Sequence, residues 1–396
     1  MLNPIIEISM ATKYQPIVQE LVDMMKEYGW VDKFKEAIAK TASYNIVGME
    51  DVKDLDSWLN WINMFVTWVP RENRWGNLCL EYLCKFYFVF DQSPVKELQN
   101  PVVPHNVEQP LTPLSAWLKR YMNAQGEFLD TPESLTPETL KTFYEAPDYN
   151  MGEYVCPRGG WKSFNEFFAR YTKPGYRPVA GLDDDRVIVA AAEAHFDGQW
   201  EVNSGTKVNC KGLYWSIDEL LEGSKYKDCF KGGQWTHSFL NTNDYHRQHA
   251  PVAGRIVEAR VIQGTTYVNI TAEPVPGQPG KNQIKHEQIT APDTAGYEFM
   301  QTRGCIIIDS PIGLVGVLPI GMSNVSSVIL TAEEGRVLHK GEEISYFQFG
   351  GSDYCMVFQE HANVSFTAQP GVHYKVGTRI AVAEPVVGLQ RPKIIC

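Results

Sequence analysis

A serine preceded by two glycines, Gly350-Gly351-Ser352, follows the run Phe347-Gln348-Phe349 near the end of the chain. Two glycines before a serine most simply make a turn between strands, because glycine adopts backbone angles that other residues avoid. The same residues could also cleave the backbone. The Ser352 hydroxyl would attack the carbonyl of Gly351 to form an ester, and elimination and hydrolysis would leave a pyruvoyl group. Glycine suits the attacked position because it permits a strained turn and a close approach.

Two histidines, His246 and His249, stand three positions apart in the segment Asp244–Pro251. Such a pair often belongs to a satisfied polar network or to half of a metal site. No Glu-His helix accompanies it, and the eight cysteines contain no CxxC pair, so a zinc site of the usual spacing is not expected. The pair could instead transfer protons. Self-cleavage needs a base for Ser352, and decarboxylation needs an acid that protonates the new carbanion.

Several separated segments resemble, in the same order, motifs of the phosphatidylserine decarboxylase superfamily. They are Ser163–Arg170 (SFNEFFAR) with Lys173-Pro174-Gly175 and Arg177-Pro178, Lys211–Leu221 (KGLYWSIDELL), Tyr245–Pro251 (YHRQHAP), Gly321–Val325 (GMSNV), Lys340–Glu343 (KGEE) and Phe349–Ser352 (FGGS). Each motif alone is weak, but the ordered set is specific. The resemblance covers about Gly160 to Phe358 and favours self-cleavage over a plain turn.

The resemblance implies a role for each candidate residue. Ser352 becomes the pyruvoyl group, and cleavage between Gly351 and Ser352 gives a β-subunit of residues 1–351 and an α-subunit of residues 352–396. His249 activates Ser352 for cleavage, and His246 donates a proton during decarboxylation. The family places an Asp in a PADG-like strand to orient the processing histidine. Glu193 stands there in this chain, and His195 is a nearby rival.

The resemblance also implies the cofactor and the substrate class. The prosthetic group is a pyruvoyl group made from Ser352, with neither pyridoxal phosphate nor a metal. Glu193 and the GGS site are similar to the branch with fungal tryptophan decarboxylases. We therefore expect a carboxy-lyase that converts a free amino acid, aromatic or unusual, into an amine in specialised metabolism. Phosphatidylserine is the alternative substrate. A binding or scaffold protein is the alternative class, and its mark would be loss of Ser352 or of both histidines.

The elements that must position these residues fall into two regions. Residues 1–150 are predicted to form a helical N-terminal extension. Its candidate helices are 15–27, 31–40, 55–69, 78–90, 114–123 and 137–145, and a proline-punctuated linker lies between Pro101 and Pro113. Two Thr-Pro steps, Thr131-Pro132 and Thr136-Pro137, could each begin a helix. The second is favoured because a longer helical pattern follows it.

Residues 151–396 are predicted to form a β-rich catalytic domain, so the fold class is α+β. Short β-branched runs at Val187–Ala190, Arg255–Ile262 and Cys305–Asp309 are interrupted by glycines. The segments 250–257 and 332–344 share a Gly-x-Val/Ile pattern that is typical of lipoyl-like β-sandwich barrels. Lipoyl and biotinyl carrier proteins require a lysine with particular flanking residues at a hairpin tip. Neither segment has such a lysine, so a carrier protein is not predicted.

Composition restricts the partners and the compartment. The formal net charge is −11 and no basic run occurs, which argues against nucleic acid. The most apolar stretch among the predicted helices, Trp58–Val69, is shorter than the about 20 residues of a membrane span. Its helical spacing indicates a core helix, with an interfacial membrane helix as the alternative. Without an evident secretory signal, we expect a cytoplasmic protein with reduced cysteines, and a homodimer stays open.

Overall fold

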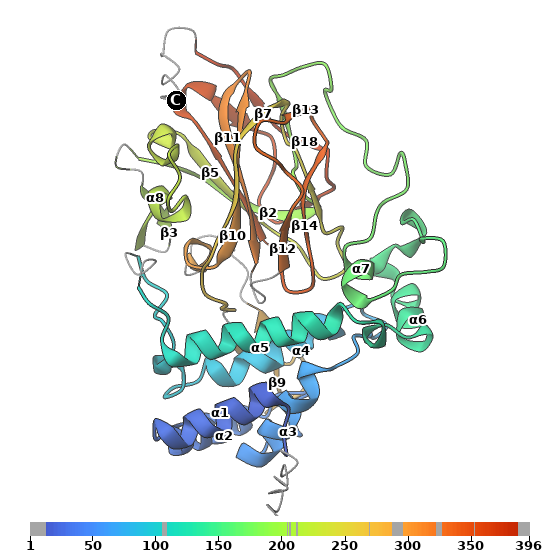
Figure 1. Cartoon of the computed structure of the whole chain (residues 1–396), viewed down its shortest axis with the longest axis vertical. Coiled ribbons are helices and arrows are strands. Elements are labelled where there is room, and N and C mark those ends of the chain that lie inside the picture. Colours follow the sequence, from blue (N-terminus) through green and yellow to red (C-terminus); the bar gives the residue numbers. More distant parts are fainter. Residues whose placement is uncertain are drawn as a thin grey trace, which may run out of the picture.

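The computed structural model describes residues 13–104, 109–203, 205, 207–210, 213–268, 270–286, 296–321, 327–351 and 353–386. Its first part is helical, and its second part is built mainly from strands (Figure 1). The helices of the first part are α1 (Pro16–Glu27), α2 (Val31–Ser43), α3 (Leu55–Val66), α4 (Leu78–Phe90), α5 (Pro113–Leu129) and α6 (Pro137–Glu145). The six predicted helices are therefore all present. This architecture confirms the α+β fold class.

The helix ends follow local chemistry. Helix α6 begins where it was predicted, because the Thr136 hydroxyl accepts a hydrogen bond from the Thr139 N–H at 3.2 Å. The competing Thr131-Pro132 step starts only the short 3₁₀ helix Pro132–Ser134. Helix α5 continues past its predicted end to Leu129, since its last turns are buried and the Gln125 amide donates to the carbonyl of Phe65.

Helix α3 is a core helix. Its aromatic side chains Trp58, Trp61 and Phe65 are buried, and the Trp58 ring packs against Phe34 and Phe90. The apolar stretch is thus covered by other helices, which confirms the core interpretation and makes the interfacial-membrane alternative wrong. Within the described residues, no helix has both the length and the apolar character required to cross a bilayer.

The strands of the second part form one large sheet and several small ones. The eight-stranded sheet is antiparallel throughout, with the order β13-β7-β10-β11-β15-β5-β2-β17. Its strands are β13 (Val337–Leu338), β7 (Gly254–Ile262), β10 (Thr302–Ser310), β11 (Gly313–Gly321), β15 (Asp353–Phe358), β5 (Gln234–Phe239), β2 (Ala194–Glu201) and β17 (Val372–Tyr374). Strand β15, which follows Ser352, is therefore a central strand.

Two three-stranded sheets flank the large one. The first has the order β12-β14-β6 and comprises β12 (Val328–Leu330), β14 (Glu343–Phe347) and β6 (Arg247–His249). The second has the order β1-β18-β16 and comprises β1 (Val187–Val189), β18 (Arg379–Ala383) and β16 (Val364–Phe366). Strand β14 ends at the turn that leads to Ser352, and its neighbour β6 carries His249. One small sheet thus connects two of the predicted site segments.

The two segments with a shared glycine pattern lie side by side. Strand β13 pairs with β7, with Val337 opposite Arg255 and Leu338 opposite Gly254. Gly254 has a φ of +159°, and a Cβ there would lie 2.4 Å from the carbonyl oxygen of Asp309. The glycine is required by close packing of backbones at this position.

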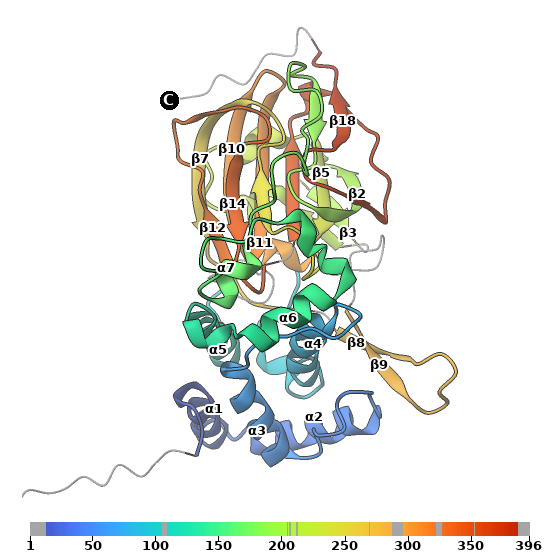
Figure 2. The same cartoon turned by 90° about the vertical axis from the view of Figure 1, so that its right-hand side faces the viewer.

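The helical and β-rich parts share one continuous buried core. A hairpin of β8 (Ile270–Pro274) and β9 (Asn282–His286) leaves the β-rich part and lies beside α4 (Figure 2). The Asn282 amide donates to the carbonyl of Tyr44 at 2.6 Å, and Asp91 accepts from the N–H of Ile270 at 2.9 Å. The helical extension is thus held firmly against the region that carries the site.

Candidate active site

The turn before Ser352 is tightly packed. It joins β14 to β15, and Gly350 adopts a φ of +110°, in the region that favours glycine. A Cβ on Gly351 would lie 2.4 Å from the Phe347 ring, so this position also requires glycine. Ser352 itself lies outside the described residues. The described part of the turn has the restricted, glycine-dependent backbone that the sequence predicted for the cleavage site.

Helix α7 (Phe164–Phe168), from the Ser163–Arg170 motif, holds this turn in place. The Asn165 side chain accepts a hydrogen bond from the Phe349 N–H at 3.1 Å and donates to Asp130 at 2.9 Å. The Phe349 ring packs against the rings of Phe164 and Phe168. A motif nearly two hundred positions upstream therefore fixes the backbone next to Gly350.

His246 lies beside the same turn and is fully buried. Its carbonyl accepts from the Phe347 N–H at 2.8 Å, and its ring stacks on Phe168 with centroids 3.9 Å apart. Neither ring nitrogen makes a hydrogen bond of normal geometry to a described residue. Burial, together with the nearby Arg170, lowers the pKa of His246 well below its usual value. The imidazole is therefore neutral at pH 7.

His249 is held by a hydrogen bond at each ring nitrogen. Nδ1 lies 2.7 Å from the carbonyl oxygen of Gly341, and Nε2 lies 2.9 Å from the Tyr245 hydroxyl. A carbonyl can only accept, so Nδ1 carries the proton and donates to Gly341. Burial lowers the pKa of His249 and raises that of Tyr245. His249 is thus a neutral imidazole whose Nε2 lone pair accepts from Tyr245, which is the tautomer a general base needs.

A cavity of about 200 Å³ reaches His249. Its wall includes Lys173, Gly175 and Arg177, which follow the Ser163–Arg170 motif, and Gly341. His249, the candidate base for self-cleavage, is therefore next to an open space, whereas His246 is enclosed on all sides.

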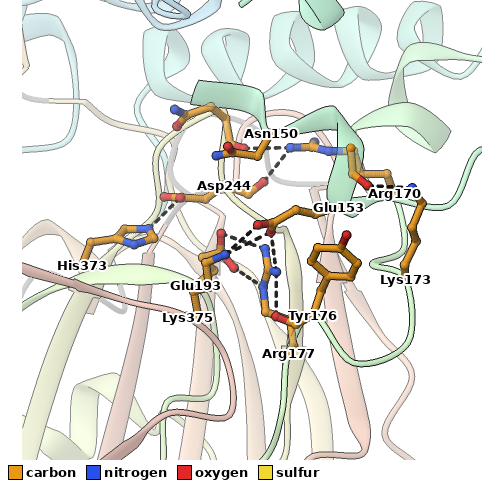
Figure 3. Close-up of polar contacts among 12 residues, drawn as sticks. Asn150, Glu153, Arg170, Lys173, Tyr176, Arg177, Glu193, Asp244, His373 and Lys375 are labelled. Carbon is orange, nitrogen blue, oxygen red and sulfur yellow. Dashed lines mark hydrogen bonds and ion pairs between the residues drawn. The ribbon is translucent and has the colours of Figure 1, made fainter. Parts of the chain in front are cut away.

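Glu193 is buried and belongs to a network of charges rather than to His249 (Figure 3). Arg177 binds both carboxylate oxygens of Glu193, one of them through Nη2 at 3.1 Å, and it also binds Glu153 at 2.6 Å. Glu153 accepts in turn from Lys375 at 2.9 Å. In this structure Arg177 binds Glu193, whereas Gly341 and Tyr245 bind His249, so no contact joins Glu193 to His249 within the described residues. The role of Glu193 in orienting His249 stays a prediction.

The loop before the histidines is fixed from two sides. The Arg170 guanidinium donates to the carbonyls of Asn243 and Asp244 at 2.8 and 3.1 Å (Figure 3). The Asp244 carboxylate accepts from His373 at 2.7 Å, which raises the pKa of His373. His195 packs against the His373 ring, with centroids 4.8 Å apart. The rival His195 thus belongs to this neighbouring pair.

The structure brings most of the predicted segments together, and it adds residues that reasoning from the sequence missed. Tyr245, Asn165 and Phe168 stand inside the quoted motifs, so their positions were a signal, but no role was given to them. Gly341 acts through its carbonyl, which no side-chain pattern reveals. Two motif segments, Lys211-Gly212 and Met322–Val325, lie outside the described residues.

Comparison with known proteins gives the same family. The family model for phosphatidylserine decarboxylase matches residues 164–382, which is more than half of the chain. This chain belongs to the phosphatidylserine decarboxylase family.

The names of individual relatives differ in the substrate that they give. The chain is 32% identical over 247 residues to phosphatidylserine decarboxylase proenzyme 2 of Oryza sativa, covering 62% of this chain and 37% of that protein. It is 31% identical over 301 residues to decarboxylase iboD of Amanita muscaria, covering 67% and 83%. It is 27% identical over 242 residues to the L-tryptophan decarboxylase of Psilocybe cubensis, covering 59% and 54%. The match thus spans little more than a third of the rice protein.

Proposed function

We propose that this chain is the precursor of a pyruvoyl-dependent decarboxylase that acts on a free amino acid in the cytoplasm. One observation carries the proposal: the Gly350-Gly351 turn, the Ser163–Arg170 motif and the segment with His246 and His249 meet in one place. The six cysteines whose side chains are described are all free, as is usual in a reducing compartment.

In the proposed self-cleavage, His249 Nε2 removes the proton of the Ser352 hydroxyl. The hydroxyl oxygen attacks the Gly351 carbonyl, the peptide C–N bond breaks, and an ester forms. Elimination releases the Gly351 carboxylate and leaves dehydroalanine at position 352. Hydrolysis of dehydroalanine then releases ammonia and leaves the pyruvoyl group. Gly341 fixes the proton on Nδ1, so the lone pair of His249 lies on Nε2, which supports this role. The Tyr245 hydroxyl, which donates to that lone pair here, would have to turn away before Nε2 accepts the Ser352 proton.

The pyruvoyl group supplies a ketone that draws electrons from the substrate as carbon dioxide leaves. The residues present fit the formation of such a group, because the turn before Ser352 requires both glycines. Gly350 has a positive φ, and a Cβ on Gly351 would clash with the Phe347 ring. His246 would deliver a proton to the substrate carbon. Its buried, neutral imidazole needs a negative charge nearby to become an acid, and the arriving substrate carboxylate would provide one.

A free amino acid is favoured as the substrate over phosphatidylserine. Among the relatives, iboD is named only a decarboxylase and another is named for L-tryptophan, whereas several others are named for phosphatidylserine. The names alone thus leave both substrates open, and the choice rests on the surface of this chain. A phospholipid enzyme must hold itself at a bilayer through apolar or basic surface. The apolar helix α3 is buried here, and the net charge of −11 opposes anionic lipid surfaces.

The central test compares the unchanged chain with Ser352→Ala. On a denaturing gel the unchanged chain should give two fragments, and the smaller one should begin with a pyruvoyl group by mass spectrometry. Ser352→Ala should stay intact and inactive, because it lacks the attacking hydroxyl. Decarboxylation by Ser352→Ala would refute the pyruvoyl assignment.

The substrate is tested separately. Amine release from free amino acids is compared with turnover of phosphatidylserine in vesicles, with vesicle co-sedimentation measured alongside. Turnover of the lipid without turnover of any amino acid would overturn the substrate choice and leave the pyruvoyl chemistry intact.

A further inference from the structure

A second polar cluster lies in the large sheet, directly after Ser352 in the chain. It consists of His237 on β5, Asp197 on β2, Asp353 on β15 and Glu298 in the 3₁₀ helix Tyr297–Phe299. Strands β2, β5 and β15 are neighbours in the sheet, so their side chains on one face converge. His237, Glu298 and Asp353 are 0% exposed and Asp197 is 5% exposed. Three of the four side chains are thus shielded from solvent, and the fourth is nearly so.

The cluster lies on the opposite face of β15 from the large shared core. Tyr354, Met356 and Phe358 pack in that core, whereas Cys355 and Val357 pack in a second, smaller core. Side chains alternate between the faces of a strand, so Asp353 shares the face of Cys355. The cluster is therefore separate from the histidine site.

The imidazole of His237 is oriented by Asp197. Its Nδ1 lies 2.7 Å from Asp197 Oδ2, and a carboxylate oxygen accepts this hydrogen bond. Its Nε2 points instead toward Glu298 Oε1 at 3.5 Å and Asp353 Oδ2 at 3.9 Å. A carboxylate that fixes one imidazole nitrogen while the other faces further ligands is the usual support of a metal-binding histidine.

The groups that face one another lack hydrogen bonds to the rest of the described chain. His237 Nε2, both carboxylate oxygens of Glu298 and both of Asp353 make no hydrogen bond within the described part of the chain. A buried polar atom without a partner costs about 1–3 kcal/mol, and charged groups cost more. Three carboxylates surround a single histidine, so the cluster has an excess of negative charge that something must neutralise.

We propose that His237, Glu298 and Asp353 bind one divalent metal ion, with Asp197 as the support of His237. The ligand atoms of the three residues all lie within 4.8 Å of one another. Metal–ligand bonds of about 2.0–2.2 Å at tetrahedral angles separate the ligands by about 3.4 Å, close to the two separations from His237 Nε2. One imidazole nitrogen and two carboxylates suit Zn²⁺ or Mn²⁺. The sequence predicted no metal, and this ion would stabilise the sheet.

A more exposed cluster, His195, Asp244 and His373, provides the internal comparison. Its ligand atoms also lie within 4.8 Å of one another. Asp244 already accepts a hydrogen bond from His373 Nε2 at 2.7 Å, so its charge has a partner. A variant of His373 therefore serves as a matched control for metal binding elsewhere in the same protein.

The test measures metal in the full chain, purified without a polyhistidine tag or chelator. We expect about one Zn²⁺ or Mn²⁺ per chain by mass spectrometry of the elements, none in Glu298→Gln, and an unchanged content in His373→Gln. Removing the ion with a chelator should lower the melting temperature, and adding Zn²⁺ or Mn²⁺ should restore it. Should Glu298→Gln fail to fold, Asp197→Asn keeps the three ligands and should bind the ion about 10–100-fold more weakly.

Each outcome decides the proposal independently of the decarboxylase chemistry. Metal retained by Glu298→Gln, or lost from His373→Gln, would overturn the assignment of the ligands. The chain could also prove metal-free after purification, with a melting temperature that does not change when Zn²⁺ or Mn²⁺ is added. This result would show that the cluster holds protons instead of a metal ion.

Discussion

The two histidines of one short segment have opposite surroundings. His249 has a hydrogen-bond partner at each ring nitrogen and touches a cavity, whereas His246 is enclosed, stacked on Phe168, and has no hydrogen bond of normal geometry. His246 lies just before β6, whereas His249 is the last residue of that strand. A histidine held in one tautomer suits a reaction that the folded precursor performs alone. A histidine whose ring nitrogens make no hydrogen bond of normal geometry to a described residue suits a reaction that awaits a substrate.

Of the variants that test this difference between the two histidines, His249→Ala should have the largest effect. Without its base, the Ser352 hydroxyl should attack about 10²–10⁴-fold more slowly, and decarboxylation should fail because no pyruvoyl group forms. The appearance of the small fragment on denaturing gels measures the rate. His195→Ala serves as the control and should cleave normally. If His249→Ala cleaved at the normal rate, another residue would be the base.

His246→Ala should separate the two reactions. The chain should still cleave, but kcat for decarboxylation should fall by about 10²–10⁴-fold because a positioned proton donor is lost. Fragment formation and amine release are measured on the same preparation. An uncleaved His246 variant would instead indicate that the two histidines share or exchange their roles, which the position of His246 next to Phe347 would then explain.

Glu193→Gln should affect stability more than cleavage. Arg177 would keep its bond to Glu153 but lose a charged partner in a buried site, which lowers the free energy of unfolding by about 1–3 kcal/mol. Cleavage should slow by less than tenfold, since Glu193 does not touch His249. Denaturant unfolding and gel kinetics give the two values. A cleavage defect as large as that of His249→Ala would restore the direct role first predicted for Glu193.

Tyr245→Phe should give the smallest effect, a shift of the pH profile of cleavage. The base works when it is unprotonated, and burial lowers the pKa of His249, so cleavage should persist to pH values below the usual histidine range. The Tyr245 hydroxyl stabilises the neutral imidazole by donating to Nε2. Its removal raises the pKa of His249 and should move the acidic limb of the profile to higher pH. An unchanged acidic limb would argue against His249 as the titrating base.

The helical part and the ordered motifs could be predicted because their signals are local. Thr136 and Pro137 mark the start of α6, and the spacing of Trp58, Trp61 and Phe65 marks a buried helix face. Such patterns depend on neighbours within a few residues. The motif order then indicated which segments belong to one site.

The polar partners could not be predicted because they depend on sheet register. Glu193 and His249 were paired by analogy, yet Arg177 lies close enough to bind both oxygens of Glu193. Asp197, His237 and Asp353 meet only because β2, β5 and β15 are neighbours in a particular register. No spacing along the chain indicates that convergence.

The central place of β15 has a consequence for the mature enzyme. A cut between Gly351 and Ser352 would leave β15 hydrogen-bonded between β11 and β5, and would leave β17 and β18 paired with β2 and β1. The smaller chain could leave only if these ladders opened together. Once denatured, however, the two chains would have to find each other, so recovery would depend on protein concentration as it does for an obligate dimer. The precursor would fold as one molecule. The cleaved enzyme would then be stable mainly because it unfolds slowly.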